Sequence, residues 1–172
     1  MKFPVLHLGG KVNSGKARRR ADILPSFVAL PFGSGRNNLG DMMGGRYFAG
    51  LALPAYTRDK LAALRANFRG LNFQRPDRYH LTLKFFGDVG SGPVAELRAR
   101  LAELQTAAFI LEVGEVGRFP DDPLPPRVLW AGLVRPPPQL YHLQQKIESL
   151  AFQSGFEPST RGFKPHITLA NV

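Results

Sequence analysis

A short string of histidine, an aliphatic residue, threonine and leucine occurs twice, and this repeat constrains the fold more than any other feature of the chain. The two copies are residues 80–83 (HLTL) and 166–169 (HITL), which lie 86 residues apart. Both strings alternate polar and apolar residues, a pattern typical of a strand with one buried face. In each half of the chain the string follows an earlier strand pattern and a helix pattern. The repeat therefore predicts two similar halves, each contributing one such strand.

The remaining patterns predict the order strand, helix, strand, helix and then strand, strand, helix, strand. Thr57 is the expected N-cap of the first helix, Gly70 is its expected stop, and Pro93 is expected to open the second helix. The third helix carries an apolar stripe at helical spacing and is expected to end near Gly155. The expected strands are residues 46–54, 80–86, 109–116, 127–134 and 166–170.

The chain has the size and composition of one soluble globular domain, with 172 residues of which 44% are hydrophobic and 21% charged. Its first 45 residues differ from the rest, because they hold seven basic and two acidic side chains and eight of the 18 glycines. Such a composition rarely supports a packed core. We expect residues 1–45 to be a basic, glycine-rich, disordered tail and residues 46–172 to form the folded domain.

The overall charge favours a polyanionic partner. The chain carries 23 Lys and Arg against 13 Asp and Glu, a net charge of +10, which suits RNA, DNA or a membrane surface. It has no cysteine, and this excludes disulfides, thiolate zinc sites, iron–sulfur clusters and cysteine nucleophiles. No apolar run approaches the roughly 20 residues that a spanning helix needs. We therefore expect a cytoplasmic protein without a membrane segment.

The chemistry of the repeat lies in the face that it leaves polar. His80 and Thr82 point to one side of their strand, about 6.5 Å apart, while the intervening leucine points into the core. His166 and Thr168 have the same arrangement in the second copy. If the two strands lie side by side or face each other, two imidazoles and two hydroxyls enclose a volume the size of a phosphate. An imidazole pair can supply a base and an acid near pH 7, and threonine hydroxyls can donate to phosphoryl oxygens.

Other side chains near these strands leave alternatives open. By alternation Lys84 shares the face of the first histidine and threonine, so it either touches phosphate or stands exposed at the strand edge. Phe119, Trp130 and Phe163 could stack on a base or pack in the core. The two histidines come without an HExxH string or a carboxylate cluster, so we expect no metal site.

These strings together resemble one known family. RYFAGLALP at 46–54, HLTLKFFGDV at 80–89, RVLWAGL at 127–133 and FKPHITLA at 163–170 resemble the 2H phosphoesterases in order and spacing. Within that superfamily they resemble the bacterial RNA 2',3'-cyclic phosphodiesterases once named 2'-5' RNA ligases. The resemblance implies a two-lobed, pseudo-symmetric α+β fold of the LigT-like kind, with antiparallel sheets around a central cleft.

The resemblance also implies an activity and assigns roles to the repeated residues. The reaction is the opening of an RNA 2',3'-cyclic phosphate to a 2'-phosphate without metal or cofactor, with 2'-5' RNA ligation as a side activity. His80 would be the proton donor and His166 the proton acceptor, while Thr82 and Thr168 would hold the phosphate. The implied partner is an RNA end, bound by a monomer that does not use a membrane. The alternative is a non-catalytic RNA-binding protein derived from the same fold.

Two departures from the family pattern affect what we expect at the ends of the chain. Family members begin near the string that matches Arg46, so Met42 or Met43 is the expected natural start and residues 1–41 are an added tail or an upstream misread. Members also continue past the second string, often with a basic residue where Asn171 stands. Because this chain stops at Val172, we expect a final strand to be missing and the second lobe to lack pairing partners.

Overall fold

The computed structural model of the chain describes residues 5–8, 45–65, 69–107, 109–121 and 123–172. Within this part the expected order of elements is present, with two further short strands and one turn of 3-10 helix at Pro76–Arg78. The strands are β1 (Val5–Leu8), β2 (Gly45–Ala52), β3 (Asn72–Phe73), β4 (His80–Val89), β5 (Phe109–Phe119), β6 (Val128–Leu133) and β7 (His166–Asn171). The helices are α1 (Ala55–Ala62), α2 (Ser91–Ala102) and α3 (Pro138–Gln153).

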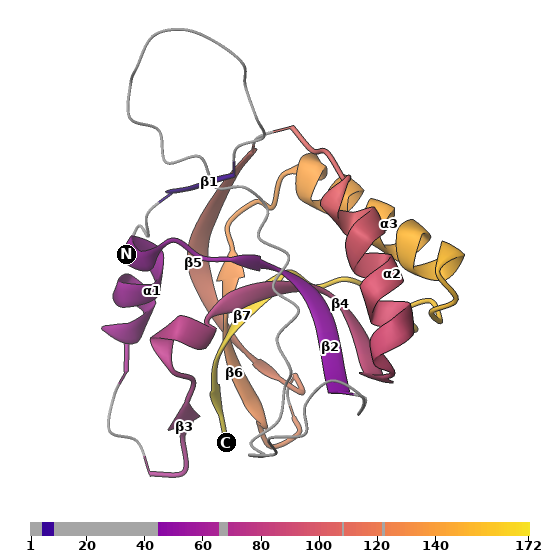
Figure 1. Ribbon diagram of the computed structural model, residues 1–172. Coiled ribbons are helices and arrows are strands. Elements are labelled where there is room, and N and C mark those ends of the chain that lie inside the picture. The colour runs from indigo at the N-terminus through magenta and orange to yellow at the C-terminus, as the bar shows by residue number, and fades with distance from the viewer. Residues whose placement is uncertain (1–4, 9–44, 66–68, 108, 122) are drawn as a thin grey trace, which may run out of the picture.

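The strands of both halves of the chain form one sheet, and the two halves meet near its centre. Their order is β1-β5-β6-β7-β4-β2, with β3 pairing with the end of β7, and the pairs are antiparallel. The halves meet where Leu81 of β4 pairs with Ile167 of β7. Figure 1 shows these two strands crossing the middle of the molecule. The predicted α+β fold with antiparallel, pseudo-symmetric halves is confirmed.

The pseudo-symmetry includes an irregularity directly after each threonine of the repeat. In β4, Thr82 and Lys84 pair with consecutive residues of β2, so Leu83 forms a bulge. In β7, Thr168 and Ala170 pair with consecutive residues of β6, and Leu169 forms the equivalent bulge. Because a bulge inserts one residue into a strand, the two side chains after each threonine both turn inward, and all four are buried.

Two helices cover the face of the sheet into which these residues turn. α2 and α3 lie side by side, with α3 packed against β4, and α1 lies on the other side of the molecule (Figure 1). The inner stripe of α3 is at most 1% exposed and consists of Leu140, Leu143, Ile147 and Ala151. This stripe packs into one core with Leu81 and Ile167, which are 0% exposed. The apolar residues of the repeat are therefore the centre of the core.

The helix starts differ from the predictions. α1 begins at Ala55 directly after Pro54, and Thr57 is buried inside the first turn instead of capping the helix. The N-cap position is occupied by Pro54, whose ring fixes φ at −58°, and no side chain caps the helix. α2 likewise begins at Ser91, two residues before Pro93, because a proline in the first turn removes no helical hydrogen bond.

The ends of the folded part bear on two expectations. β1 pairs with β5 inside the segment expected to be disordered. The other residues before Gly45 lie outside the described part, so the tail stays a prediction for them. At the other end β7 has neighbours on both sides, β6 on one and β4 and β3 on the other. The expected lack of pairing partners is therefore not found for this strand.

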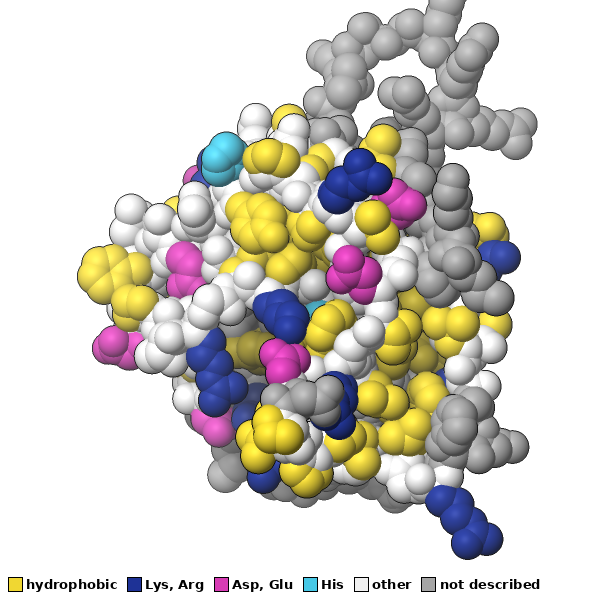
Figure 2. Space-filling view, turned by 180° about the vertical axis from the view of Figure 1, so that it is seen from behind, with side chains coloured by type: hydrophobic (Ala, Val, Ile, Leu, Met, Phe, Trp, Pro, Cys, Tyr) yellow, Lys and Arg dark blue, Asp and Glu magenta, His cyan; other side chains and the backbone are white. Residues whose placement is uncertain are grey.

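The surface of the described part carries scattered charge, and its helices are short. No helix in the described ranges is both long and apolar enough to cross a membrane. Figure 2 shows Lys and Arg side chains spread over one face of the molecule among hydrophobic and acidic ones. Among the described residues of this face, basic side chains therefore have acidic and apolar neighbours.

Candidate active site

The four residues singled out in the repeat come together on one face of the sheet. β4 and β7 are antiparallel neighbours in which Leu81 pairs with Ile167. Continuing that register by one residue either way sets His80 across from Thr168 and Thr82 across from His166. The paired Leu81 and Ile167 point into the core, so these four side chains point to the opposite face, where each is half-buried. The seam between the two halves therefore carries a histidine and a threonine from each.

A backbone carbonyl orients each imidazole in the same way. Nδ1 of His80 lies 2.6 Å from the carbonyl oxygen of Arg78, and Nδ1 of His166 lies 2.7 Å from that of Lys164. A carbonyl oxygen can only accept, so Nδ1 carries the proton in both rings. In the neutral form Nε2 then has the free lone pair, and in the charged form it has the transferable proton. Either ring can therefore serve as base or acid through Nε2.

Each imidazole packs against an aromatic side chain. The Phe48 ring stacks on His80 with centroids 4.3 Å apart and an interplanar angle of 21°. Gly50 makes room for this ring, because a Cβ there would lie 3.2 Å from the ring and 2.9 Å from the Leu81 carbonyl oxygen. Phe119 meets His166 edge-on at 4.9 Å. Ring contacts of this kind stabilise the observed orientation of each imidazole.

Trp130 extends the aromatic support of His166. It lies 5.3 Å from Phe119 and 6.2 Å from His166, measured between ring centroids. A Cβ at Gly117 would fall 2.1 Å from the Trp130 ring, so this glycine leaves the space that the indole fills. Nζ of Lys164 lies 5.0 Å from the Phe119 centroid and 4.9 Å from the Trp130 centroid, and it pairs with Asp121 at 3.5 Å. A positive charge therefore stands beside His166.

The surroundings lower the pKa of both histidines below the ordinary value. For His80, burial lowers the pKa, the bond to the Arg78 carbonyl partly offsets this, and the charge of His166 lowers it further. For His166, burial again lowers the pKa, the bond to the Lys164 carbonyl opposes it, and the Lys164 charge adds to the lowering. Both surroundings therefore favour the neutral imidazole more than water does.

The structure decides the alternatives left open by the sequence. Lys84 is neither at the phosphate face nor exposed, because the bulge at Leu83 turns it inward, where its side chain is 2% exposed. Phe119 and Trp130 pack against each other and His166, while Phe163 packs edge-on against Tyr141. Within the described residues no three His, Asp or Glu side chains gather into a metal-binding group. Independence from metal stays a prediction.

Sequence reasoning missed several residues of the site. Local patterns place Phe48 and Gly50 only in an apolar strand, and they do not indicate the carbonyl oxygens two residues before each histidine. The residues at that position are Arg78 and Lys164, but their side chains give no signal of the bonds, because every residue has a carbonyl oxygen. The stacking of Phe48 on His80 had no local signal either, because it depends on the register of β2 against β4.

Comparisons with known proteins agree with this arrangement. The family model described as LigT like Phosphoesterase matches residues 51–130. The RNA 2',3'-cyclic phosphodiesterase of Escherichia coli (strain K12) is 34% identical over 127 residues, 72% of this chain and 70% of that protein. The protein of the same name from Aeropyrum pernix is 34% identical over 96 residues, 56% of this chain, and the match spans about half of that relative, 54%.

A solved structure extends the similarity to the whole fold. The crystal structure of E. coli LigT in its apo form superposes with a TM-score of 0.64 at 31% sequence identity. The superposition covers 75% of this chain and 73% of that one. The same arrangement of helices and antiparallel strands is therefore present in both molecules.

Proposed function

The chain belongs to the LigT-like phosphoesterase family, and we propose on this basis that it hydrolyses 2',3'-cyclic phosphate ends of RNA to 2'-phosphate ends. The observation that carries the proposal is the seam of β4 and β7. There two imidazoles with free Nε2 atoms and two threonine hydroxyls share one face of the sheet. The names of the relatives supply the substrate class, and the residues at the seam supply the chemistry.

In the proposed reaction the two histidines act in one in-line step. Nε2 of His166 takes a proton from water as the water oxygen attacks phosphorus, and a new P–O bond forms. The bond between phosphorus and the 3' oxygen breaks, and Nε2 of His80 gives its proton to that oxygen. The products are a 2'-phosphate and a free 3' hydroxyl. Thr82 and Thr168 donate hydrogen bonds to the non-bridging oxygens and hold the phosphate between the rings.

The division of roles between the histidines follows the family resemblance. The two halves place both imidazoles in similar settings, each with Nδ1 bound to the carbonyl two residues before it. In the ligation reaction the 5' hydroxyl of a second RNA replaces water as the nucleophile: His166 takes its proton, its oxygen bonds to phosphorus, and the 3' oxygen leaves with the proton from His80. The 2'-5' ligase side activity therefore needs no further group.

The proposal is tested with a short RNA that ends in a 2',3'-cyclic phosphate, incubated with the protein in the presence of EDTA. A 2'-phosphate product is expected, identified by its resistance to an enzyme that removes only 3'-phosphates. A 3'-phosphate product, or a requirement for divalent metal, would refute the proposed chemistry. Binding of the RNA without any turnover would support the alternative, a non-catalytic RNA-binding protein.

A further inference from the structure

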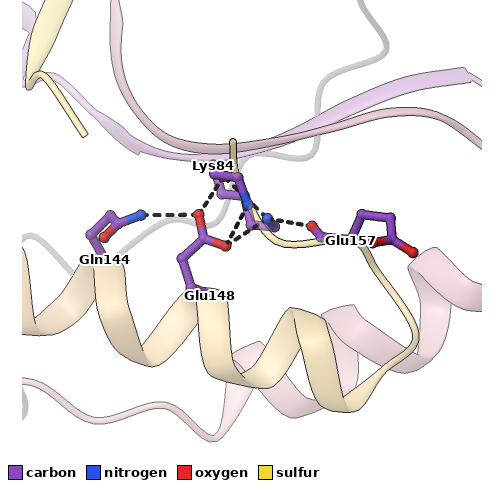
Figure 3. A network of polar contacts seen from close by, with 5 residues as sticks. Lys84, Gln144, Glu148 and Glu157 are labelled. Atoms are coloured by element: carbon purple, nitrogen blue, oxygen red, sulfur yellow. Dashed lines mark hydrogen bonds and ion pairs between the residues drawn. The ribbon is translucent and has the colours of Figure 1, made fainter. Parts of the chain in front are cut away.

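A buried lysine lies beside the site without facing it. Lys84 comes two residues after Thr82 on β4, and its side chain is 2% exposed. Its Nζ donates to Oε2 of Glu148 at 2.7 Å, to the Glu157 carbonyl at 3.0 Å and to Oγ of Ser159 at 3.3 Å (Figure 3). These three bonds use the three donors of the ammonium group. Lys84 therefore acts on its own partners and has no donor left for a phosphate.

Through these partners, Lys84 connects strand β4 in the protein interior with α3 and with the loop that leads into strand β7. Glu148 lies on α3, while Glu157 and Ser159 lie in the loop that runs from α3 to His166. The carboxylate of Glu148 also accepts hydrogen bonds from Gln144 at 3.1 Å and from the Ser159 hydroxyl. Burial would raise the pKa of Glu148, but the bonds from Lys84 and Ser159 outweigh it and lower the pKa. The network therefore connects β4 by hydrogen bonds to the loop between α3 and β7.

The second half of the molecule indicates what the fold itself needs at this position. The residue equivalent to Lys84 in the repeat is Ala170, which follows the equivalent bulge in β7 and is 0% exposed. In the second half the bulge is thus followed by a buried alanine, whose methyl group makes no hydrogen bond. A buried ion pair is a weak source of stability, because loss of hydration offsets much of the attraction. The Lys84–Glu148 pair is therefore better explained by a role in placing β4 than by a contribution to the free energy of unfolding.

We propose that Lys84 and Glu148 are positioning residues, which set the placement of strand β4, with His80 and Thr82, relative to the loop that leads into His166 of β7. Neither side chain touches the reacting atoms. Their effect passes through the bulge next to Thr82 and through the loop before β7. The inference rests on the proposed function, since the geometry that matters is that of the two histidines around one phosphate. Because a small misplacement affects the transition state most, the pair acts on kcat more than on KM.

The test replaces the pair with apolar side chains. Lys84→Met alone should lower the melting temperature, because it leaves the Glu148 carboxylate without its main partner. The double variant Lys84→Met with Glu148→Leu should melt within a few degrees of the parent protein. On a dinucleotide 2',3'-cyclic phosphate, the double variant should nevertheless lose about 10- to 100-fold in kcat with KM changed less than about threefold. Lys146→Met, which removes an exposed lysine from α3, is the matched control and should change neither constant.

A second readout does not depend on turnover. In the parent protein the charge of His166 lowers the pKa of His80, so the titration of His80 followed by NMR reports how the two rings are placed. The double variant should shift that titration, whereas Lys146→Met should not. A stable double variant with parental kcat would overturn the positioning role. If the parent protein has no turnover, the proposed function fails, and an unchanged His80 titration in the double variant would then overturn this inference separately.

Discussion

At the scale of single residues, the proposal depends on two imidazoles acting as a unit. His80→Ala and His166→Ala are each expected to lose about 100-fold or more in kcat, because each removes one partner of a concerted proton transfer. The double variant should lose little more, since groups that act together are not additive. His142→Ala, which changes an exposed histidine of α3, is the control. A single histidine variant that keeps the parental rate would exclude the two-histidine mechanism.

The pH dependence follows from the state that each histidine must have. His166 must be neutral to take a proton and His80 must be charged to give one, so kcat/KM follows a bell. Because the pKa values of both residues are lowered in the free protein, both limbs move to lower pH, and the kcat/KM optimum should lie below about pH 6.5. A bound phosphate anion favours the charged imidazole, so the limbs for kcat should lie at higher pH.

Lys164 provides a variant that tests this account of the pH profile. The groups that face His166 are Lys164, its partner Asp121 and, across the seam, His80. Lys164→Met removes a charge that lowers the pKa of His166, so the acid limb of kcat/KM should move to higher pH. Lys146→Met should leave the limb in place, and a shift of equal size in both variants would indicate a general charge effect instead.

At the scale of elements, the close pairing of β2 and β4 decides how His80 is held. Gly50→Ala would place a Cβ 2.9 Å from the Leu81 carbonyl oxygen and 3.2 Å from the Phe48 ring. The Leu81 backbone, next to His80, must then shift and the Phe48 ring must give by a few tenths of an ångström, at a cost of about 1–3 kcal/mol in the free energy of unfolding, as is usual for overpacking. We expect kcat to fall about tenfold from misplacement of the imidazole. Gly162→Ala, where the Cβ would meet nothing within 4 Å, is the control and should leave kcat unchanged.

At the scale of the whole molecule, the segment before β2 is expected to be dispensable for chemistry. A protein starting at Met43 loses β1, which pairs with β5 at the far edge of the sheet, with β6 between β5 and the motif strand β7. Its kcat on a dinucleotide cyclic phosphate should be unchanged. Binding of longer RNA should weaken and become less salt-dependent, because the removed residues carry seven basic and two acidic side chains. A large loss of activity on the dinucleotide would place this segment at the site.

The sequence by itself determined which residues are the candidates for the site and which strands carry them. The alternation in residues 80–83 and 166–169 separates a buried face from a polar face, because successive side chains of a strand point to opposite sides. This local rule does not depend on the neighbours of a strand. It therefore places His80 with Thr82, and His166 with Thr168, on the polar face of their own strand.

The tertiary structure decided what lies around those residues. Alternation places Lys84 on the face of His80 and Thr82 only if β4 is regular. The bulge at Leu83, which turns Lys84 inward, arises from the pairing of β4 with β2. The stacking of Phe48 on His80 and the network of Lys84 with Glu148 likewise join residues from separate elements. Pairing register and helix placement are long-range properties, set by how all the elements pack at once. Local periodicity carries no information about them, and so only the folded chain fixes how the two histidines are oriented.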